Sequence, residues 1–194
     1  MKKTLWLLAV LVLVFLASAT YVSLKKPETE EVVSPVVQDV KNIQYVVNGE
    51  VFTLINGKAE LQVAPDSAAK NTLTMFGEPV YGDLDGDGDA DAAVLLVNEP
   101  GGSGTFYYAS LAINTAGVYK ATETMLLGDR IAPQTVEIHE GRAVYNIAIR
   151  KGTDPMSTPP SIGQSIWVHY DAKTNSIGEW VKDFEGESAT TTKR

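Results

Sequence analysis

Residues 90–97 have the sequence ADAAVLLV, a nearly continuous run of apolar side chains. A short run of this kind that is bounded by turn residues is typical of a strand buried on both of its faces. Residues 105–114, TFYYASLAIN, have a similar character, and the segment GGSG lies between the two runs. We therefore expect two buried strands joined by a glycine loop.

Alternating patterns lie on the C-terminal side of these runs. Residues 135–139, 142–150 and 166–170 each alternate apolar and polar side chains, which predicts three further strands. The expected inward positions are Val136, Ile138, Ala143, Tyr145, Ile147, Ile149, Ile166, Val168 and Tyr170. Glu140-Gly141 predicts a turn between the first two of these strands.

The N-terminal side carries two Asn-Gly pairs, at residues 48–49 and 56–57, which are strong signals for two-residue hairpins. Short apolar segments flank both pairs, at residues 45–47, 51–55 and 59–61. This spacing predicts a three-stranded meander. Residues 65–71 are expected to form one short helical turn.

After Lys25 no stretch of ten or more residues has the hydrophobic pattern of an amphipathic helix. Short strands with regular turn signals indicate a mainly β protein, a compact domain built on an antiparallel sheet. The alternative is an α+β domain with one short helix. In either case an N-terminal hydrophobic segment precedes the domain.

That N-terminal segment begins with Lys2 and Lys3 and continues as an uncharged stretch over residues 5–24. As a secretory signal peptide it would be cleaved at the small-residue box of residues 17–19. As an uncleaved anchor it would use its whole length, since about 20 apolar residues span a bilayer. Both interpretations place the rest of the chain outside the cytoplasm, in the cell envelope, either secreted or held by a single membrane span.

The domain organisation follows from these features. We expect residues 1–26 to be the signal peptide or membrane anchor and residues 27–41, rich in Glu and with two prolines, to be a linker. Residues 42–186 are the expected β domain, and residues 187–194 a disordered tail.

The segment DLDGDGDAD, residues 83–91, matches the pattern D-x-D-x-D-G-x-x-D. Its carboxylates belong to Asp83, Asp85, Asp87, Asp89 and Asp91. The alternative interpretation is an acidic turn that binds nothing, because Asp and Gly are turn residues in any loop. Carboxylates this close together repel one another without a cation, however, and Ca²⁺ takes about six to eight oxygen ligands. The sequence therefore predicts a calcium site at these five residues.

The spacing within this loop indicates which kind of calcium site to expect. Gly88 at the sixth position permits a sharp turn, Asp89 would offer its backbone carbonyl, and Asp91 would bind directly or through water. The twelfth position is Val94, within a strand pattern, and not the bidentate Glu of an EF-hand. Mg²⁺ is disfavoured because it prefers fewer carboxylates and strict octahedral geometry. We expect a strand–loop–strand calcium site.

Residues 76–91, FGEPVYGDLDGDGDAD, resemble the FG-GAP repeat of integrin-type propellers, both in Phe76-Gly77 and in the aspartates. The resemblance implies Ca²⁺ bound between strands. The chain holds one copy, whereas a propeller needs about four or more blades, so a propeller fold is not implied.

A second resemblance extends over roughly residues 45–187. The strings GGSGTFYY (residues 101–108), LGDRI (127–131) and DPM (154–156) are similar to a domain of uncharacterised bacterial envelope proteins. That domain often lies beside a META (HslJ-like) domain. The resemblance implies a location in the envelope and brings no enzymatic activity with it.

Charge and composition exclude several functions. The chain has 16 basic and 24 acidic residues, a formal charge of -8, and no cysteine. The acidic balance argues against sequence-independent nucleic-acid binding, which needs a surplus of Lys and Arg. The lack of cysteine excludes disulfides, thiolate metal sites and a thiol nucleophile.

The function we expect is that of an exported, non-enzymatic β domain with one structural Ca²⁺, tethered to the membrane by its N-terminal segment. Its role would be adhesion or ligand binding, with an envelope protein or a glycan as partner. The alternative is an envelope hydrolase, or an inhibitor of one. A hydrolase would need Ser103 beside a histidine, or two of the carboxylates Glu137, Glu140 and Asp154, in one cleft.

Smaller expectations concern three charged or titratable sites. His139 and His169 lie on the polar sides of predicted strands, so we expect them to face solvent. Asp129-Arg130 is expected to form an ion pair that orders the loop before Pro133.

Overall fold

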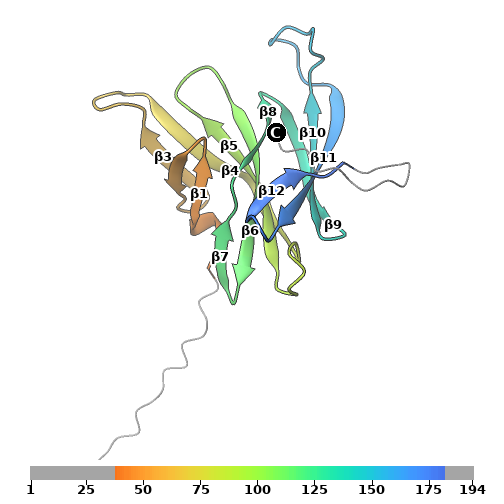
Figure 1. Ribbon diagram of the computed structural model, residues 1–194. Helices are drawn as coiled ribbons and strands as arrows, with labels where there is room; N and C mark the ends of the chain where they lie inside the picture. The colour runs from red at the N-terminus through yellow and green to blue at the C-terminus, as the bar shows by residue number, and fades with distance from the viewer. Residues whose placement is uncertain (1–37, 182–194) are drawn as a thin grey trace, which may run out of the picture. The chain divides into compact units, whose positions relative to one another are not determined.

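The computed structural model describes residues 38–181, in which strands and one short 3-10 helix, η1 (Val40–Asn42), make up the regular structure (Figure 1). The strands are β1 (Gln44–Val47), β2 (Glu50–Thr53), β3 (Lys58–Gln62), β4 (Lys70–Gly82), β5 (Asp91–Glu99), β6 (Phe106–Thr115), β7 (Val118–Ala121), β8 (Met125–Asp129), β9 (Ala132–His139), β10 (Arg142–Ile149), β11 (Ile162–Asp171) and β12 (Ser176–Glu179). The expected signal peptide or anchor, most of the linker and the expected tail lie outside the described residues.

The strands form three antiparallel sheets. The largest has the order β3-β4-β5-β6-β7, and β8 pairs with β6 beside β7. A four-stranded sheet has the order β12-β11-β10-β9, and β1 pairs with β2 alone. The prediction of a mainly β domain with antiparallel pairing is confirmed, and residues 38–181 contain no α-helix.

The six-stranded sheet is buried on both faces, as the apolar run in β5 predicts. Ala92, Val94 and Leu96 belong to one hydrophobic cluster. Ala93 and Leu95, which point to the opposite face, belong to a second. Because successive side chains of a strand alternate between faces, a continuous apolar run is what a layer with a core on either side requires.

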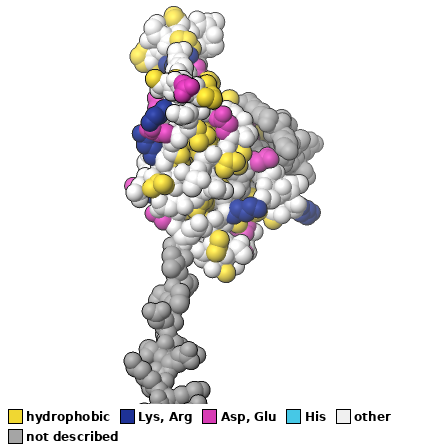
Figure 2. Space-filling model, turned by 90° about the vertical axis from the view of Figure 1, so that its left-hand side faces the viewer, with side chains coloured by type: hydrophobic (Ala, Val, Ile, Leu, Met, Phe, Trp, Pro, Cys, Tyr) yellow, Lys and Arg dark blue, Asp and Glu magenta, His cyan; other side chains and the backbone are white. Residues whose placement is uncertain are grey.

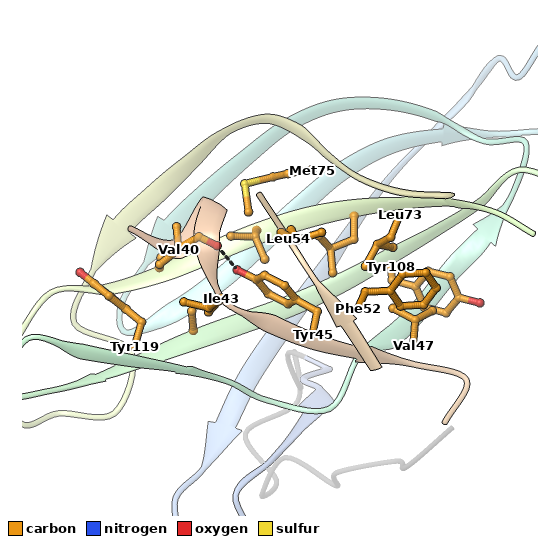
Figure 3. Close-up of a cluster of buried hydrophobic side chains, with 14 residues drawn as sticks. Val40, Ile43, Tyr45, Val47, Phe52, Leu54, Leu73, Met75, Tyr108 and Tyr119 are labelled. Carbon is orange, nitrogen blue, oxygen red and sulfur yellow. Dashed lines mark hydrogen bonds between the residues drawn. The ribbon is translucent and has the colours of Figure 1, made fainter. Parts of the chain in front are cut away.

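The first cluster lies between the six-stranded sheet and the β1–β2 hairpin (Figure 3). Tyr45 and Phe52, one from each strand of the hairpin, are fully buried there. The hydroxyl of Tyr45 donates to the carbonyl of Val40 at 2.9 Å, which satisfies the buried phenol and fixes η1 against the cluster. Val40 is therefore part of the domain core and not of the linker in which the sequence placed it.

The second cluster lies between the six-stranded sheet and the four-stranded sheet. Tyr145 of β10 is fully buried in it, and its hydroxyl lies 3.1 Å from the carbonyl of Val94 and 3.0 Å from that of Ser110. Burial raises the pKa of this phenol well above its usual range. Tyr145 thus links the two sheets by a hydrogen bond as well as by packing.

The β1–β2 hairpin and the residues that follow it contact the six-stranded sheet at two places. Val46 forms a parallel bridge with Glu123, and Ile55 forms an antiparallel bridge with Lys58. The hydroxyl of Thr124 also donates to the carbonyl of Val46 at 2.9 Å. These contacts tie the hairpin and Ile55 to the larger sheet.

The predicted three-stranded meander is wrong. Both Asn-Gly turns form, with positive φ at Asn48, Gly49, Asn56 and Gly57, but only the first joins two paired strands. Beyond the Ile55–Lys58 bridge the chain diverges, and β3 pairs with β4 in the large sheet. A tight turn specifies a local reversal, whereas the length of the ladder depends on which apolar face each strand must bury.

Two other expectations also differ from the structure. The predicted helical turn at residues 65–71 does not form: residues 65–69 hold a turn and a bend, and β4 begins at Lys70. The alternating strand around Ile166 is predicted to be the last strand of the chain, but β12 follows it and pairs with β11. The alternating strands around Val136 and Tyr145 are confirmed as β9 and β10, joined by the predicted turn.

The surface of the domain is mixed. On the face that Figure 2 presents, hydrophobic side chains occur singly or in small groups among charged and polar ones. Within residues 38–181 no helix has the length and apolar character needed to cross a membrane.

Candidate metal centre

The aspartate loop connects two strands that pair directly with each other. β4 ends at Gly82 and β5 begins at Asp91, and these two residues are partners in the antiparallel register. The ladder therefore holds the two ends of the loop together. This is the strand–loop–strand arrangement that the sequence predicts.

Two glycines allow the loop its tight curvature. Gly86 and Gly88 have φ values of 86° and 91°, in the left-handed region that side chains with a Cβ rarely adopt. No other atom would lie within 4 Å of a Cβ at either position. The requirement for glycine here comes from backbone conformation and not from crowding.

Aspartate side chains hold the loop by accepting hydrogen bonds from its backbone. The three bonds run from Gly86 N to Asp83 Oδ1 at 2.7 Å, from Asp87 N to Asp85 Oδ1 at 3.0 Å, and from Asp89 N to Asp87 Oδ1 at 2.8 Å. Such Asx turns explain why Asp is favoured in this segment even before any ligand is considered.

Asp91 is fully buried and anchors the loop to the sheet. Its Oδ2 accepts from Leu84 N at 2.8 Å, and its Oδ1 accepts from Asn114 N, also at 2.8 Å. The side chain of Leu84 packs in the second hydrophobic cluster. One carboxylate thus ties the start of the loop to β6, which lies on the far side of β5.

Burial raises the pKa of Asp91, because a carboxylate loses favourable hydration when it leaves water. The two backbone hydrogen bonds lower the pKa and oppose that effect, and the negative charges of Asp85 and Asp87 raise it further. A bound cation would act in the opposite direction and favour the charged form.

Three of the carboxylates converge. Asp83, Asp85 and Asp91 each offer an oxygen, and these oxygens all lie within 4.8 Å of one another. Two oxygens that bind the same Ca²⁺ at about 2.3–2.6 Å are separated by at most about 5 Å. The triad could therefore hold a metal ion. Three oxygens are fewer than any hard cation requires, so backbone carbonyls or water would complete the shell.

The other two predicted ligands lie outside this triad. Asp87 uses one carboxylate oxygen to accept from Asp89 N, and both residues are exposed. The expectation that Asp89 would contribute its backbone carbonyl stays a prediction.

The candidate site lies at the junction of the two larger sheets. A Cβ on Gly141, in the β9–β10 turn, would lie 3.7 Å from the carbonyl oxygen of Asp83. Burial raises the pKa of Tyr170 in β11, and the charges of Asp85 and Asp91 raise it further. The loop therefore acts electrostatically on the second sheet as well as on its own.

Sequence reasoning missed the residues that brace the loop from β6 and β7. Asn114 donates through Nδ2 to the carbonyl of Ala90 at 3.2 Å, and the hydroxyl of Tyr119 donates to the same carbonyl at 2.8 Å. Asn114 Oδ1 also accepts from Gly117 N at 2.8 Å. The Asn-to-Gly spacing signals a turn, but nothing local to it signals contact with the aspartate loop.

The predicted Asp129–Arg130 ion pair is confirmed, with 2.7 Å between Arg130 Nη2 and Asp129 Oδ2. The guanidinium lowers the pKa of Asp129. Asp129 Oδ1 also accepts from Thr105 N at 3.1 Å, so the pair fixes the end of the glycine loop that joins β5 to β6.

The two histidines differ from each other. His139 is exposed as predicted, and its Nε2 lies 2.8 Å from Glu137 Oε2. His169 is half-buried, and its Nδ1 has no hydrogen-bond partner among the described residues. The prediction of a solvent-facing side chain is correct for His139 only.

The residues of the hydrolase alternative lie on β9 and in three different loops and turns, and Glu137 of β9 contacts His139. Ser103 lies exposed in the β5–β6 loop, and Glu140 lies exposed in the β9–β10 turn. Asp154 accepts from Lys151 N at 3.3 Å within the β10–β11 loop.

No protein-family model, no curated protein and no solved structure matches this chain. The function must therefore be argued from the residues of the site themselves.

Proposed function

We propose that this protein is an exported, non-enzymatic β domain that binds one structural Ca²⁺ at residues 83–91 and serves adhesion or ligand binding at the cell envelope. The observation that carries the proposal is the convergence of the Asp83, Asp85 and Asp91 carboxylates at the junction of two sheets.

The chemistry of the loop favours Ca²⁺ among the hard cations. Ca²⁺ accepts several carboxylates together with backbone carbonyls in irregular geometry, whereas Mg²⁺ demands near-ideal octahedral geometry and retains water. The loop is acidic, and Asp83, Asp87 and Asp89 in it are exposed. Asp83, Asp85 and Asp91 would hold the ion directly.

The ion would act through folding linkage. A ligand that binds the native loop and not the unfolded chain stabilises the protein by mass action. Because Leu84 and Asp91 are anchored in the domain interior, that stabilisation would reach the packing between the sheets. At the calcium concentrations outside cells, a dissociation constant of about 10⁻⁴–10⁻³ M is sufficient.

The test is thermal unfolding of the full chain in detergent, with excess Ca²⁺ and with chelator. We expect two results: a higher unfolding temperature with Ca²⁺ than with chelator, and a measurable heat of Ca²⁺ binding by calorimetry. The double variant Asp83→Asn, Asp85→Asn should lose both. Asp66→Asn, an exposed Asp in a different turn, serves as the control and should keep both. Equal midpoints with and without Ca²⁺ in the unaltered chain, together with no heat of binding, would refute the calcium proposal.

The envelope location rests on the N-terminal segment, and it has its own test. The intact mass and N-terminal sequence of the chain recovered from outside the cytoplasm should correspond either to cleavage after Ala19 or to an uncleaved anchor. Recovery of the whole chain from the cytoplasm would overturn this part of the proposal.

A further inference from the structure

A groove of about 470 Å³ lies between two sheet edges on the described part of the domain. Met125, Leu127 and Gly128 of β8 line one side, and Ile177 and Gly178 of β12 line the other. The groove is separate from the aspartate loop, none of whose residues contributes to its lining.

Both strands that flank the groove are edge strands. Within residues 38–181, β8 has β6 as its single ladder partner, and β12 has β11. An edge strand presents a row of backbone N–H and C=O groups that can pair with an added strand. Proteins commonly cover or blunt such edges, so two of them on either side of one groove form a place where an extended chain can be received.

The lining combines an apolar interior with negative charge. Met125, Leu127 and Ile177 pack partly against the second hydrophobic cluster and supply the apolar surface. Glu123 and Glu179 also line the groove, and among the described residues of the lining there is no Lys, Arg or His. Electrostatic complementarity therefore favours a basic occupant.

We propose that this groove binds an extended, basic peptide segment of a partner protein, which adds as a strand to the edge of β8. Alternate side chains of the segment would face the apolar interior, because a strand places successive side chains on opposite sides. Its basic side chains would meet the carboxylate of Glu123, which is exposed. The assignment deepens the proposed role in ligand binding but does not depend on Ca²⁺.

The lining argues against a glycan as the occupant. Sugar rings are commonly held by the exposed faces of aromatic side chains. Among residues 38–181, Tyr108 is the one aromatic residue of the lining; it is 4% exposed and accepts a hydrogen bond from Asn48 Nδ2 at 2.8 Å. Backbone edges and carboxylates fit a peptide better.

The experiment measures fluorescence anisotropy of labelled peptides with the full chain in detergent. The probe is a capped eight-residue peptide of alternating Lys and Val, and the matched peptide alternates Glu and Val. We expect the Lys peptide to bind and the Glu peptide to bind at least about tenfold more weakly. N-methylation of alternate amides on one edge of the Lys peptide should weaken binding by a similar factor, because it removes the ladder hydrogen bonds.

Charge variants of the protein locate the binding. Glu123→Lys should weaken binding of the Lys peptide about tenfold, since one attraction becomes a repulsion at this exposed residue. Glu99→Lys changes the net charge by the same amount at an exposed residue outside the lining and should leave affinity unchanged. Circular dichroism of both variants serves as the control for folding.

Several outcomes would overturn the inference. One is that the two charge variants weaken binding of the Lys peptide equally, and another is that N-methylation leaves its affinity unchanged. A third is that the groove binds neutral oligosaccharides and that Glu123→Lys abolishes this binding. A fourth is that the chain associates with itself through the groove. Measuring Ca²⁺-dependent melting on the same samples separates the two proposals. A calcium shift without peptide binding refutes the groove alone, and peptide binding without a calcium shift refutes the metal site alone.

Discussion

Asp91 has two roles that can be separated by substitution, because it accepts two backbone hydrogen bonds in the interior as well as facing the candidate ion. In Asp91→Asn one of the two accepting oxygens becomes an NH₂ group, so one buried backbone N–H loses its acceptor. We therefore expect a loss of about 2–3 kcal/mol in the free energy of unfolding even with chelator present. Denaturant unfolding of the variant and of the unaltered chain, in chelator and in Ca²⁺, measures this loss of stability.

Asp83→Asn is the matched comparison for that prediction. The change falls at an exposed residue, so stability in chelator should stay within about 0.5 kcal/mol, while the stabilisation by Ca²⁺ is lost. If Asp91→Asn proves as mild as Asp83→Asn in chelator, the anchoring role assigned to Asp91 is wrong.

Glu60 provides a prediction of pH dependence away from the metal centre. Hydrogen bonds from Lys58 and Lys70 lower its pKa from 4.5 to about 2. The folded state therefore binds fewer protons than the unfolded state between these values, and the contribution of Glu60 to stability is complete above pH 4.5 and is lost as the pH falls through about 2. Glu60→Gln should be slightly less stable than the unaltered chain at pH 7.

The same comparison repeated down to pH 2 completes that test. The difference between Glu60→Gln and the unaltered chain should close between pH 4.5 and 2, as followed by urea unfolding. A difference that is the same at pH 7 and pH 2 would show that the lysines do not act on this carboxylate.

At the level of single residues, the sequence predicts the composition of the candidate site better than its geometry. Asp83 and Asp85 can be assigned from the spacing within the loop. The burial of Asp91 and its bond to Asn114 depend on the pairing of β5 with β6, which no local pattern reveals. Asp83, Asp85 and Asp87 each accept a hydrogen bond from a backbone N–H of the loop, yet Asp87 lies outside the triad, and spacing alone does not show which carboxylates converge.

β5 is the element whose burial on both faces can be tested most directly. Leu95 is 2% exposed in the second cluster and Leu96 is 0% exposed in the first. Truncation of a buried leucine typically costs about 2–5 kcal/mol. We expect Leu95→Ala and Leu96→Ala each to lower the free energy of unfolding by this much, as measured by denaturant unfolding. On a strand with one exposed face, one of two neighbouring substitutions would have little effect.

Leu126→Ala is the control for this pair, because Leu126 lies on β8 and is 53% exposed. It should change the free energy of unfolding by less than about 0.5 kcal/mol. A small effect of either β5 substitution would mean that one of the two cores is loosely packed.

At the level of elements, strands with strong patterns were predictable and weakly patterned ones were not. β5, β6, β9, β10 and β11 each carry a continuous or alternating apolar pattern. β4 does not, because its ladder is interrupted between Phe76 and Val80, where Gly77 and Pro79 lie. β7, β8 and β12 are short: β7 and β12 pair with the strands just before them across tight turns, and β8 pairs with β6 beyond β7, so the strand pattern within each is weak.

At the scale of the whole domain, the six-stranded sheet belongs to both cores. Its strands supply Leu96 and Tyr108 to the first cluster and Leu95 and Leu111 to the second. If this sheet unfolds, the apolar faces of the β1–β2 hairpin and of the four-stranded sheet both become exposed to water. The two cores should therefore unfold in one cooperative transition, although the β1–β2 hairpin and the four-stranded sheet belong to different clusters.

Hydrogen exchange of backbone amides tests that cooperativity. Leu96→Ala opens a cavity in the first cluster, on the face of β5 away from β10, whose inward side chains lie in the second. When exchange occurs through global unfolding, the loss of protection equals the loss of stability for every amide in the cooperative unit. We expect amides in the centres of β5 and β10 to lose protection by the same factor, and a loss confined to β5 would show that the four-stranded sheet unfolds independently of the first core.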